Sequence, residues 1–416
     1  MSPLRRIDAE RGLTTFAVGY HQIHPDVGLN YQMNRFSTGT PDMVEEIRGV
    51  APKIRDYSDY TREFLALSDQ ALHRGQVLKG AYYLRSAEFY MLPDDPRKQS
   101  ARGEFVRLMR ECFGITNDVH HSLPYESAVL SSYRLTNPAA QGTIVLFGGF
   151  DSYIEELFPL QLYLREAGFD VITFEGPGQG AVLEEGHLAL TPAWDRPVRT
   201  VLDHFRLDDV TLVGYSLGGC LALRAAAREP RVRRVVADDI FTDLVDVSLR
   251  QVPPMVRATL AGLLTLGAAR LVNDFVERAM RRSLVIEWGV RQGMHVTGTS
   301  TPYHYFREAK RYRTEDISPL VEQDVLLLAG AEDHYVPLHQ FHDQIRWLTG
   351  ARSLTARRFT RQEQAQNHVQ VGNVGLSLQV IADWITERQR RDGGKAAHDA
   401  AGGECHLSPH YHSSPS

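Results

Sequence analysis

Residues 210–219 read Val-Thr-Leu-Val-Gly-Tyr-Ser-Leu-Gly-Gly, and this stretch decides the fold. An apolar β-branched run is followed at once by a glycine-flanked serine, and then by the helical pattern of residues 220–227. A G-x-S-x-G pentad in that context is a sharp turn that exposes the serine hydroxyl, and its glycines relieve crowding and backbone strain. The stretch predicts Ser216 as a nucleophile. It also predicts the N–H of Leu217, at the start of the helix, as a donor to a developing oxyanion.

Similar apolar runs recur along the chain on both sides of this stretch. Apolar and polar side chains alternate over residues 125–135, and compact apolar runs occur at 143–147, 170–174, 233–237 and 325–330. Amphipathic patterns at 157–166, 192–205, 217–228 and 375–390 separate or follow them. Short strands that alternate with helices predict an α/β fold, with a mostly parallel sheet covered by helices on both faces.

A serine hydroxyl needs a base, and the base needs an orienting acid. In a fold with this serine turn the order along the chain is serine, acid, histidine. Asp333 follows the buried run 325–330 and is the predicted acid. Glu332 is the neighbouring alternative. Asp238 or Asp239, after the preceding strand, is the other alternative.

The base is chosen by position, because the chain contains 17 histidines. It must lie beyond the acid, after the last strand and before the last helix. His368 lies between the strand-like run 352–359 and the helical run 374–389, and it satisfies both the order and the spacing. The sequence therefore predicts His368 as the general base.

A second oxyanion donor is expected from the loop after the strand 143–147. This loop reads Gly148-Gly149-Phe150-Asp151, and its glycines allow close approach of the backbone. The N–H of Phe150 is the predicted donor. A plain Gly-Gly turn is the alternative.

The regions outside the sheet pattern define the expected domains. Residues 1–122 form an irregular segment, up to about residue 39, followed by a helical domain. Residues 123–390 form the sheet domain, in which about 243–320 lack strand patterns and predict a helical cap. Residues 391–416 are rich in Gly, Ala, Ser and His without periodicity, and we expect a disordered tail.

Composition excludes several classes of partner. The 416 residues carry a net charge of only -5, so no basic field attracts nucleic acid. No uninterrupted apolar run reaches about 18 residues, which predicts no membrane span and a cytoplasmic location. Three scattered cysteines form no disulfide framework or metal motif. We expect a small-molecule substrate and neither cofactor nor metal.

Several motifs together resemble one branch of the α/β-hydrolase superfamily. They are NYQMNRF at 30–36, FGGFDSY at 147–153, FEGPGQG at 174–180, GYSLGG at 214–219, GAEDHYVP at 330–337 and FTRQEQAQNHVQVGN at 359–373. The chain is similar over about residues 31–390 to the 2,6-dihydropseudooxynicotine hydrolases and fungal polyketide-shortening hydrolases, and more distantly to FrsA-like proteins. The resemblance implies the same triad, Ser216, Asp333 and His368, and a homodimer contact.

The resemblance also implies an activity. Members hydrolyse C–C bonds in 1,3-diketones or β-keto acyl compounds, and some are esterases. The nicotine-degrading members use an extra active-site acid, for which this chain offers Asp243 or Asp246 and no Glu. Two alternatives remain: an acyltransferase or cyclase that uses the same serine in natural-product biosynthesis, and a binding protein on a hydrolase scaffold.

Overall fold

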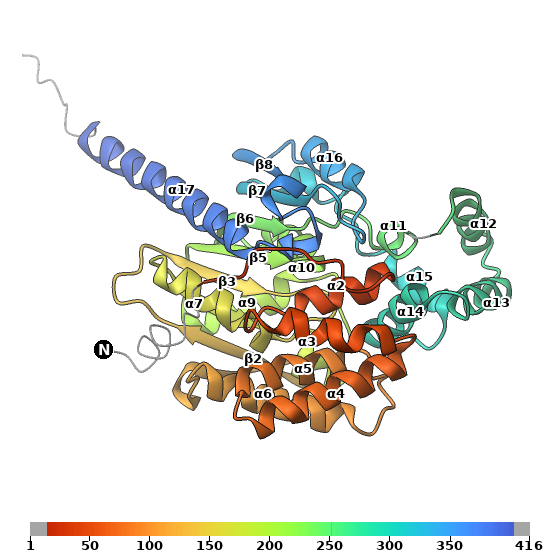
Figure 1. The fold of residues 1–416 in the computed structure, drawn as a ribbon. Helices are drawn as coiled ribbons and strands as arrows, with labels where there is room; N and C mark the ends of the chain where they lie inside the picture. Colours follow the sequence, from red (N-terminus) through yellow and green to blue (C-terminus); the bar gives the residue numbers. More distant parts are fainter. Residues whose placement is uncertain (1–14, 251, 403–416) are drawn as a thin grey trace, which may run out of the picture.

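The computed structural model describes residues 15–250 and 252–402. A sheet of eight strands forms its centre, in the order β1-β2-β4-β3-β5-β6-β7-β8 (Figure 1). β1 pairs antiparallel with β2 and β2 antiparallel with β4, whereas all later neighbours are parallel. The strands are β1 His120–Tyr125, β2 Ala128–Leu135, β3 Thr143–Phe147, β4 Asp170–Phe174, β5 Val210–Tyr215, β6 Val232–Asp238, β7 Asp324–Gly330 and β8 Ser353–Phe359. The predicted mostly parallel sheet is confirmed.

Helices cover both faces of this sheet. Along β3, Ile144 and Leu146 pack toward α7 and α17, whereas Val145 and Phe147 pack toward α9 and α10. This alternation is the two-residue period of a strand that is buried on both faces. The covering helices are α7 Phe158–Glu166, α8 Gly180–Glu184, α9 Asp195–Phe205, α10 Leu217–Ala226, α16 Leu338–Trp347 and α17 Val374–Gly402.

The last helix is longer than the sequence predicts. α17 continues to Gly402 and extends away from the sheet (Figure 1), so residues 391–402 are helical rather than irregular. The four alanines of this stretch favour helix, although its three glycines do not. The remainder of the expected tail lies outside the described residues.

Helices before the sheet form a layer of their own. They are α2 Val27–Arg35, α3 Met43–Val50, α4 Tyr57–His73, α5 Val77–Phe89 and α6 Lys98–Cys112. Their apolar side chains share one buried cluster with Tyr133 of β2 and with Phe158 and Leu162 of α7. The layer therefore packs directly on the sheet domain.

The first of these helices corrects the expectation of an irregular segment. Residues 27–35 are helical, and the Oδ1 atom of Asp26 caps them by accepting hydrogen bonds from the N–H groups of Gly28 and Leu29. Nearly the whole helix is buried, including polar Asn30 and Asn34. A helix buried all round has no apolar stripe, so periodicity did not reveal it.

Five cap helices lie between β6 and β7 along the chain. They are α11 Leu244–Ser248, α12 Pro254–Thr265, α13 Ala269–Met280, α14 Leu284–Thr297 and α15 Pro302–Ala309. α14 reaches the amino-terminal layer, where the Trp288 ring stacks on Phe89 with centroids 4.9 Å apart. Short 3-10 turns complete the structure: η1 Ala51–Lys53, η2 Asn117–Val119, η3 Ile154–Leu157, η4 Ser318–Leu320, η5 Arg361–Glu363 and η6 His368–Gln370. Across the described ranges, each helix is too short or too polar to cross a bilayer.

Candidate active site

Ser216 occupies the sharp turn between β5 and α10. Its φ of 59° and ψ of -126° are values that L residues rarely adopt. A Cβ added to Gly214 would lie 2.0 Å from the carbonyl oxygen of Gly218, and one added to Gly218 would lie 2.7 Å from that of Gly148. Both glycines of the pentad are therefore required by close backbone approach, and the turn presents Ser216 at the wall of a cavity.

A chain of hydrogen bonds leads from this hydroxyl to a buried carboxylate. The Ser216 Oγ atom lies 2.8 Å from His368 Nε2, and His368 Nδ1 lies 2.5 Å from Asp333 Oδ2. His368 is in η6, after β8, and Asp333 follows β7. Parallel strands thus bring together at one sheet edge three residues that are distant in sequence.

The orientation of Asp333 is fixed by its own loop. Its Oδ1 atom accepts hydrogen bonds from the N–H groups of Tyr335 at 2.7 Å and Val336 at 3.0 Å, which leaves Oδ2 for the imidazole. Glu332, the neighbouring alternative, is directed away and forms an ion pair with Arg361. Of the two adjacent carboxylates, only Asp333 contacts His368.

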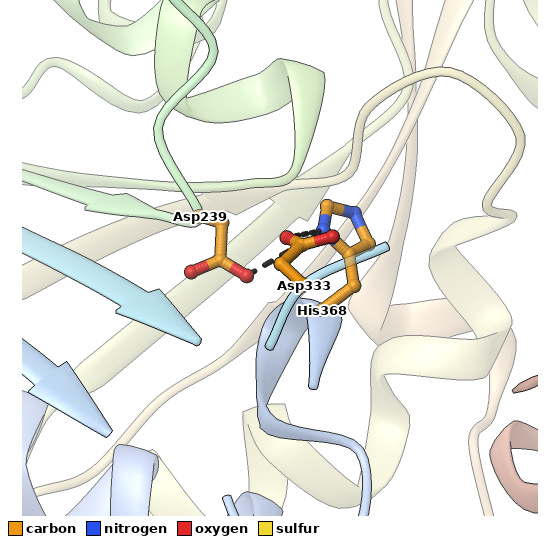
Figure 2. Close-up of side chains that lie close together, drawn as sticks. All are labelled: Asp239, Asp333 and His368. Carbon is orange, nitrogen blue, oxygen red and sulfur yellow. Dashed lines mark hydrogen bonds and ion pairs between the residues drawn. The ribbon is translucent and has the colours of Figure 1, made fainter. Parts of the chain in front are cut away.

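The other alternative, Asp239, lies close to the same imidazole. Figure 2 shows Asp239 and Asp333 on one side of His368, with Asp239 Oδ2 at 3.5 Å from Nδ1. Asp239 also accepts hydrogen bonds from the N–H of Val369 at 2.7 Å and the N–H of Gly330 at 3.0 Å. Asp333 is therefore the nearer acid, and Asp239 is a second buried carboxylate that ties the histidine loop to β7.

The pKa values of His368, Asp333 and Asp239 are shifted by different balances of burial and charge. Burial lowers the pKa of His368, but Asp333 and Asp239 outweigh burial and raise it above its ordinary value. For Asp333, burial is outweighed by His368, so its pKa is lowered. Burial raises the pKa of Asp239 to about 6 despite its bond to His368. Asp333 therefore stays ionised well below neutral pH, whereas Asp239 becomes ionised only near neutral pH; at pH 7 both carboxylates favour a protonated imidazole.

Asp239, Asp333 and His368 also have the donor types and spacing of a metal site. Both nitrogens of the His368 ring are, however, engaged within the site, one by Ser216 and one by Asp333. A metal ligand needs a free nitrogen lone pair. The arrangement therefore suits proton transfer rather than metal binding.

The loop after β3 lies directly against the start of α10. A Cβ added to Gly149 would lie 2.7 Å from the backbone nitrogen of Leu217, so only glycine permits this approach. Within the described chain, the N–H groups of Leu217 and Phe150 donate no hydrogen bond to the protein. Two such N–H groups beside the serine have the chemistry of an oxyanion hole.

A cavity of about 420 Å³ opens at Ser216 and His368. Its volume suits a drug-sized organic molecule. The lining is mostly apolar, and its residues come from the amino-terminal region, the sheet domain and the cap. Its aromatic members include Tyr31 and Phe36 of the amino-terminal region, Phe150, Phe241 and Tyr335 of the sheet domain, and Trp288 and Tyr305 of the cap.

The two aspartates offered as an extra substrate-site acid are placed elsewhere. Asp243 caps α11 through the N–H groups of Val245 and Asp246, and it forms an ion pair with Arg313. Asp246 forms ion pairs with Arg257 and His339. Neither belongs to the described residues that line the cavity, because both side chains are used to hold the start of the cap.

Sequence reasoning missed the contribution of the amino-terminal segment. Tyr31 and Arg35 both line the cavity, although the segment was expected to be irregular. Tyr31 donates a hydrogen bond to the His368 carbonyl oxygen, and Arg35 forms an ion pair with Asp151. The signal available was the motif at 30–36, which carries both residues but whose spacing predicts no particular chemistry.

Comparisons with known proteins agree with this architecture. A family model described as alpha/beta hydrolase fold matches residues 143–369, which include Ser216, Asp333 and His368. The chain is 28% identical over 370 residues to hydrolase LUC6 of Fusarium sp, covering 77% of this chain and 86% of that protein. It is 29% identical over 284 residues to 20-hydroxy-prefusarin hydrolase FUS2 of Gibberella moniliformis, covering 61% and 67%.

A solved structure extends the similarity beyond the family model. The structure of 2,6-dihydroxy-pseudo-oxynicotine hydrolase superposes with a TM-score of 0.58 at 19% identity, and it covers 85% of this chain and 93% of its own. At that identity the similarity shows the fold. Its coverage exceeds the span of the family model, so parts of the helices outside residues 143–369 are included.

Proposed function

The chain belongs to the α/β hydrolase fold family, and from that premise we propose a cofactor-independent serine hydrolase with Ser216 as nucleophile, His368 as base and Asp333 as acid. The observation that carries this proposal is the continuous hydrogen-bonded chain from Asp333 through His368 to Ser216, which ends at the cavity wall. The order of the three residues along the chain and the geometry of their hydrogen bonds are those that activate a serine hydroxyl.

The proposed reaction proceeds through an acyl-enzyme. Ser216 Oγ attacks a substrate carbonyl carbon while His368 Nε2 takes its proton, and Asp333 stabilises the resulting imidazolium. The N–H groups of Leu217 and Phe150 donate to the oxyanion. His368 then protonates the leaving group, and water, activated by the same base, hydrolyses the acyl-enzyme.

The substrate proposed is medium-sized and partly apolar. The aromatic cavity lining supports this class. The resemblance of the sequence motifs to those of fungal polyketide-shortening hydrolases supports a polyketide-like carbonyl compound. Two bonds are chemically accessible: an ester, which loses an alkoxide, and a C–C bond between two carbonyl groups, which loses an enolate. With Asp243 and Asp246 held in the cap, His368 is the proton donor to either leaving group in this proposal.

Turnover of two probe substrates tests the proposal. A p-nitrophenyl ester and a 1,3-diketone are assayed with the wild type and with Ser216→Ala. We expect the wild type to hydrolyse at least one of them, and the variant to lose about 10⁴-fold or more in kcat because the nucleophile is gone. An inactive wild type, or an equally active variant, would contradict the proposal.

The same assay separates hydrolysis from acyl transfer. In water labelled with ¹⁸O, a hydrolase places one labelled oxygen in the carboxylic acid product, because water attacks the acyl-enzyme. Unlabelled acyl product would instead show transfer to another acceptor.

A further inference from the structure

Helix α2 is the only element of the amino-terminal layer that contacts both the histidine loop and the oxyanion loop through hydrogen bonds in the described structure. We propose that Arg35 and Tyr31 of this helix are positioning residues: Arg35 holds the oxyanion loop 148–151 and Tyr31 holds the loop that carries His368. This inference rests on the proposed function, because it assigns the loops their catalytic roles. Neither residue transfers a proton or contacts the reacting atoms in this account.

Arg35 acts on the residue that follows the predicted oxyanion donor. Its Nη1 atom lies 2.9 Å from Asp151 Oδ1, and its Nη2 atom lies 2.7 Å from Glu156 Oε2. Asp151 is bonded directly to Phe150, whose N–H is the proposed donor. A guanidinium that bonds to both Asp151 and Glu156 therefore restrains the peptide next to that donor.

Arg85 of α5 closes the same network from the other side. It bonds to Glu156 Oε1 at 2.7 Å and donates from Nη2 to the Asp151 carbonyl oxygen at 2.5 Å. The loop is thus held at both the side chain and the backbone of Asp151. The Arg85 side chain is 2% exposed and that of Arg35 is 17% exposed, so water competes weakly for these bonds.

Tyr31 acts on the opposite wall of the site. Its hydroxyl donates to the carbonyl oxygen of His368 at 3.2 Å, and its buried ring packs edge-on against Tyr335. Tyr31 and Arg35 are four residues apart, so they lie on one face of α2. A single helical turn therefore spans the base loop and the oxyanion loop and fixes the distance between them.

The position of α2 is set independently of these two contacts. Asn34 Oδ1 accepts from the N–H of His21 at 2.7 Å, and Asn30 Oδ1 accepts from the N–H groups of Ile23 at 2.7 Å and His24 at 3.0 Å. Asp26 caps the first turn. This segment is joined to the rest of the layer, because His24 Nε2 lies 3.0 Å from the Ile54 carbonyl oxygen and Leu29 and Met33 lie in the apolar cluster of the layer. Arg35 and Tyr31 therefore transmit the geometry of an anchored helix to the loops.

The test compares Arg35→Lys, Asp151→Asn and the double variant with the wild type. Lysine keeps the charge but cannot bond to Asp151 and Glu156 in the same planar geometry. Since a displacement of about 1 Å costs about 100-fold in rate, we expect Arg35→Lys to lower kcat by about 10-fold to 100-fold with KM within about twofold. Affinity for a trifluoromethyl ketone, which forms a tetrahedral adduct with serine, should fall in parallel with kcat/KM.

The double variant shows whether the effect of Arg35 on kcat acts through Asp151. Asp151→Asn removes the charge of this contact and Arg35→Lys removes its planar geometry. If Arg35 acts through Asp151, the two changes impair the same contact, and the double variant should lose little more than the more impaired single variant. Tyr31→Phe, which keeps the ring, should lower kcat by a few-fold and leave the ring contacts intact. If Arg35→Lys fails to fold, the kcat of Tyr31→Phe tests the inference in its place.

Arg234→Lys is the matched control. Like Arg35, Arg234 is a largely buried arginine that forms ion pairs with two carboxylates, Asp209 and Asp392, but it does not line the cavity. This variant should lower thermal stability while kcat stays unchanged. Unchanged kcat and inhibitor affinity in folded Arg35→Lys, or multiplicative losses in the double variant, would overturn the inference. A wild type that is neither active nor labelled by a fluorophosphonate would contradict the proposed function instead.

Discussion

His368 faces two buried carboxylates at the same ring nitrogen, one at 2.5 Å and one at 3.5 Å. Only the nearer one, Asp333, has its pKa lowered, whereas burial raises the pKa of Asp239. Two acids in different environments can serve different purposes. Asp333 is placed to orient the imidazole, and Asp239 is placed to raise the pKa of His368 and to hold its loop.

This arrangement predicts a shift in the pH profile of Asp239→Asn. The base works when neutral, so a raised pKa of His368 moves the rising limb of kcat/KM above pH 6.5. Removing the Asp239 charge lowers that pKa, and the limb should move to lower pH by about one unit. The profile of kcat/KM between pH 6 and 11 measures the shift, because the pKa of His368 is raised to about 10 in the wild type.

Asp333→Asn is the comparison for that experiment. It removes the carboxylate that orients the imidazole, and activity should fall by about 10⁴-fold at neutral pH, as for the orienting aspartate of other triads. An Asp239→Asn limb at the wild-type pH would show that Asp239 has no electrostatic effect on His368. Loss of activity in Asp239→Asn equal to that in Asp333→Asn would assign both acids the same role.

At the scale of elements, the cap contributes a wall of the cavity through α14. Trp288 stacks on Phe89 of α5 and meets Phe150 of the oxyanion loop edge-on, with centroids 6.2 Å apart. The cap, the amino-terminal layer and the sheet domain therefore meet at one aromatic cluster beside Ser216. Contacts of this kind supply apolar surface to a ligand.

Trp288→Ala should weaken substrate binding more than chemistry. Loss of the indole removes apolar contact worth about 1–3 kcal/mol, so KM for a long-chain p-nitrophenyl ester should rise by about tenfold or more while kcat changes little. Short-chain esters, which do not reach the cap, should be less affected. Trp347→Ala, on α16 and outside the cavity lining, is the control. A KM that is independent of chain length in Trp288→Ala would contradict this role for the cap.

Elements differ in how well the sequence predicts them. β3, β4, β5 and β7 are short, almost wholly buried apolar runs, which the sequence shows directly. β6 and β8 each contain two arginines, and β8 is predicted mainly by its place before the last helix. Sequence periodicity does not predict α2. Its polar residues Asn30 and Asn34 are buried because they form hydrogen bonds to residues 21–24, so the helix has no apolar stripe. The helical extension to Gly402 was missed because its glycines and mixed composition resemble a linker.

In the whole molecule, the cavity is lined by residues from nearly the whole described chain, from Thr15 to Val374. Ser216, Asp333 and His368 could be predicted because the strand order imposes their sequence order on any fold of this kind. Asp151, Arg35 and Tyr31 could not, because their roles depend on contacts between separate parts of the chain. The misplaced extra acids, Asp243 and Asp246, show the same limit: their spacing fits a site, but Arg313 and Arg257 hold them in the cap.

Labelling by a fluorophosphonate tests whether Ser216 is an activated nucleophile. Intact-mass spectrometry should show one adduct on the wild type, located by peptide mapping to the segment containing Ser216. Ser216→Ala should remain unlabelled, and His368→Ala should label far more slowly because the base is gone. A folded wild type that stays unlabelled, or a Ser216→Ala variant that is labelled at the wild-type rate, would contradict the account.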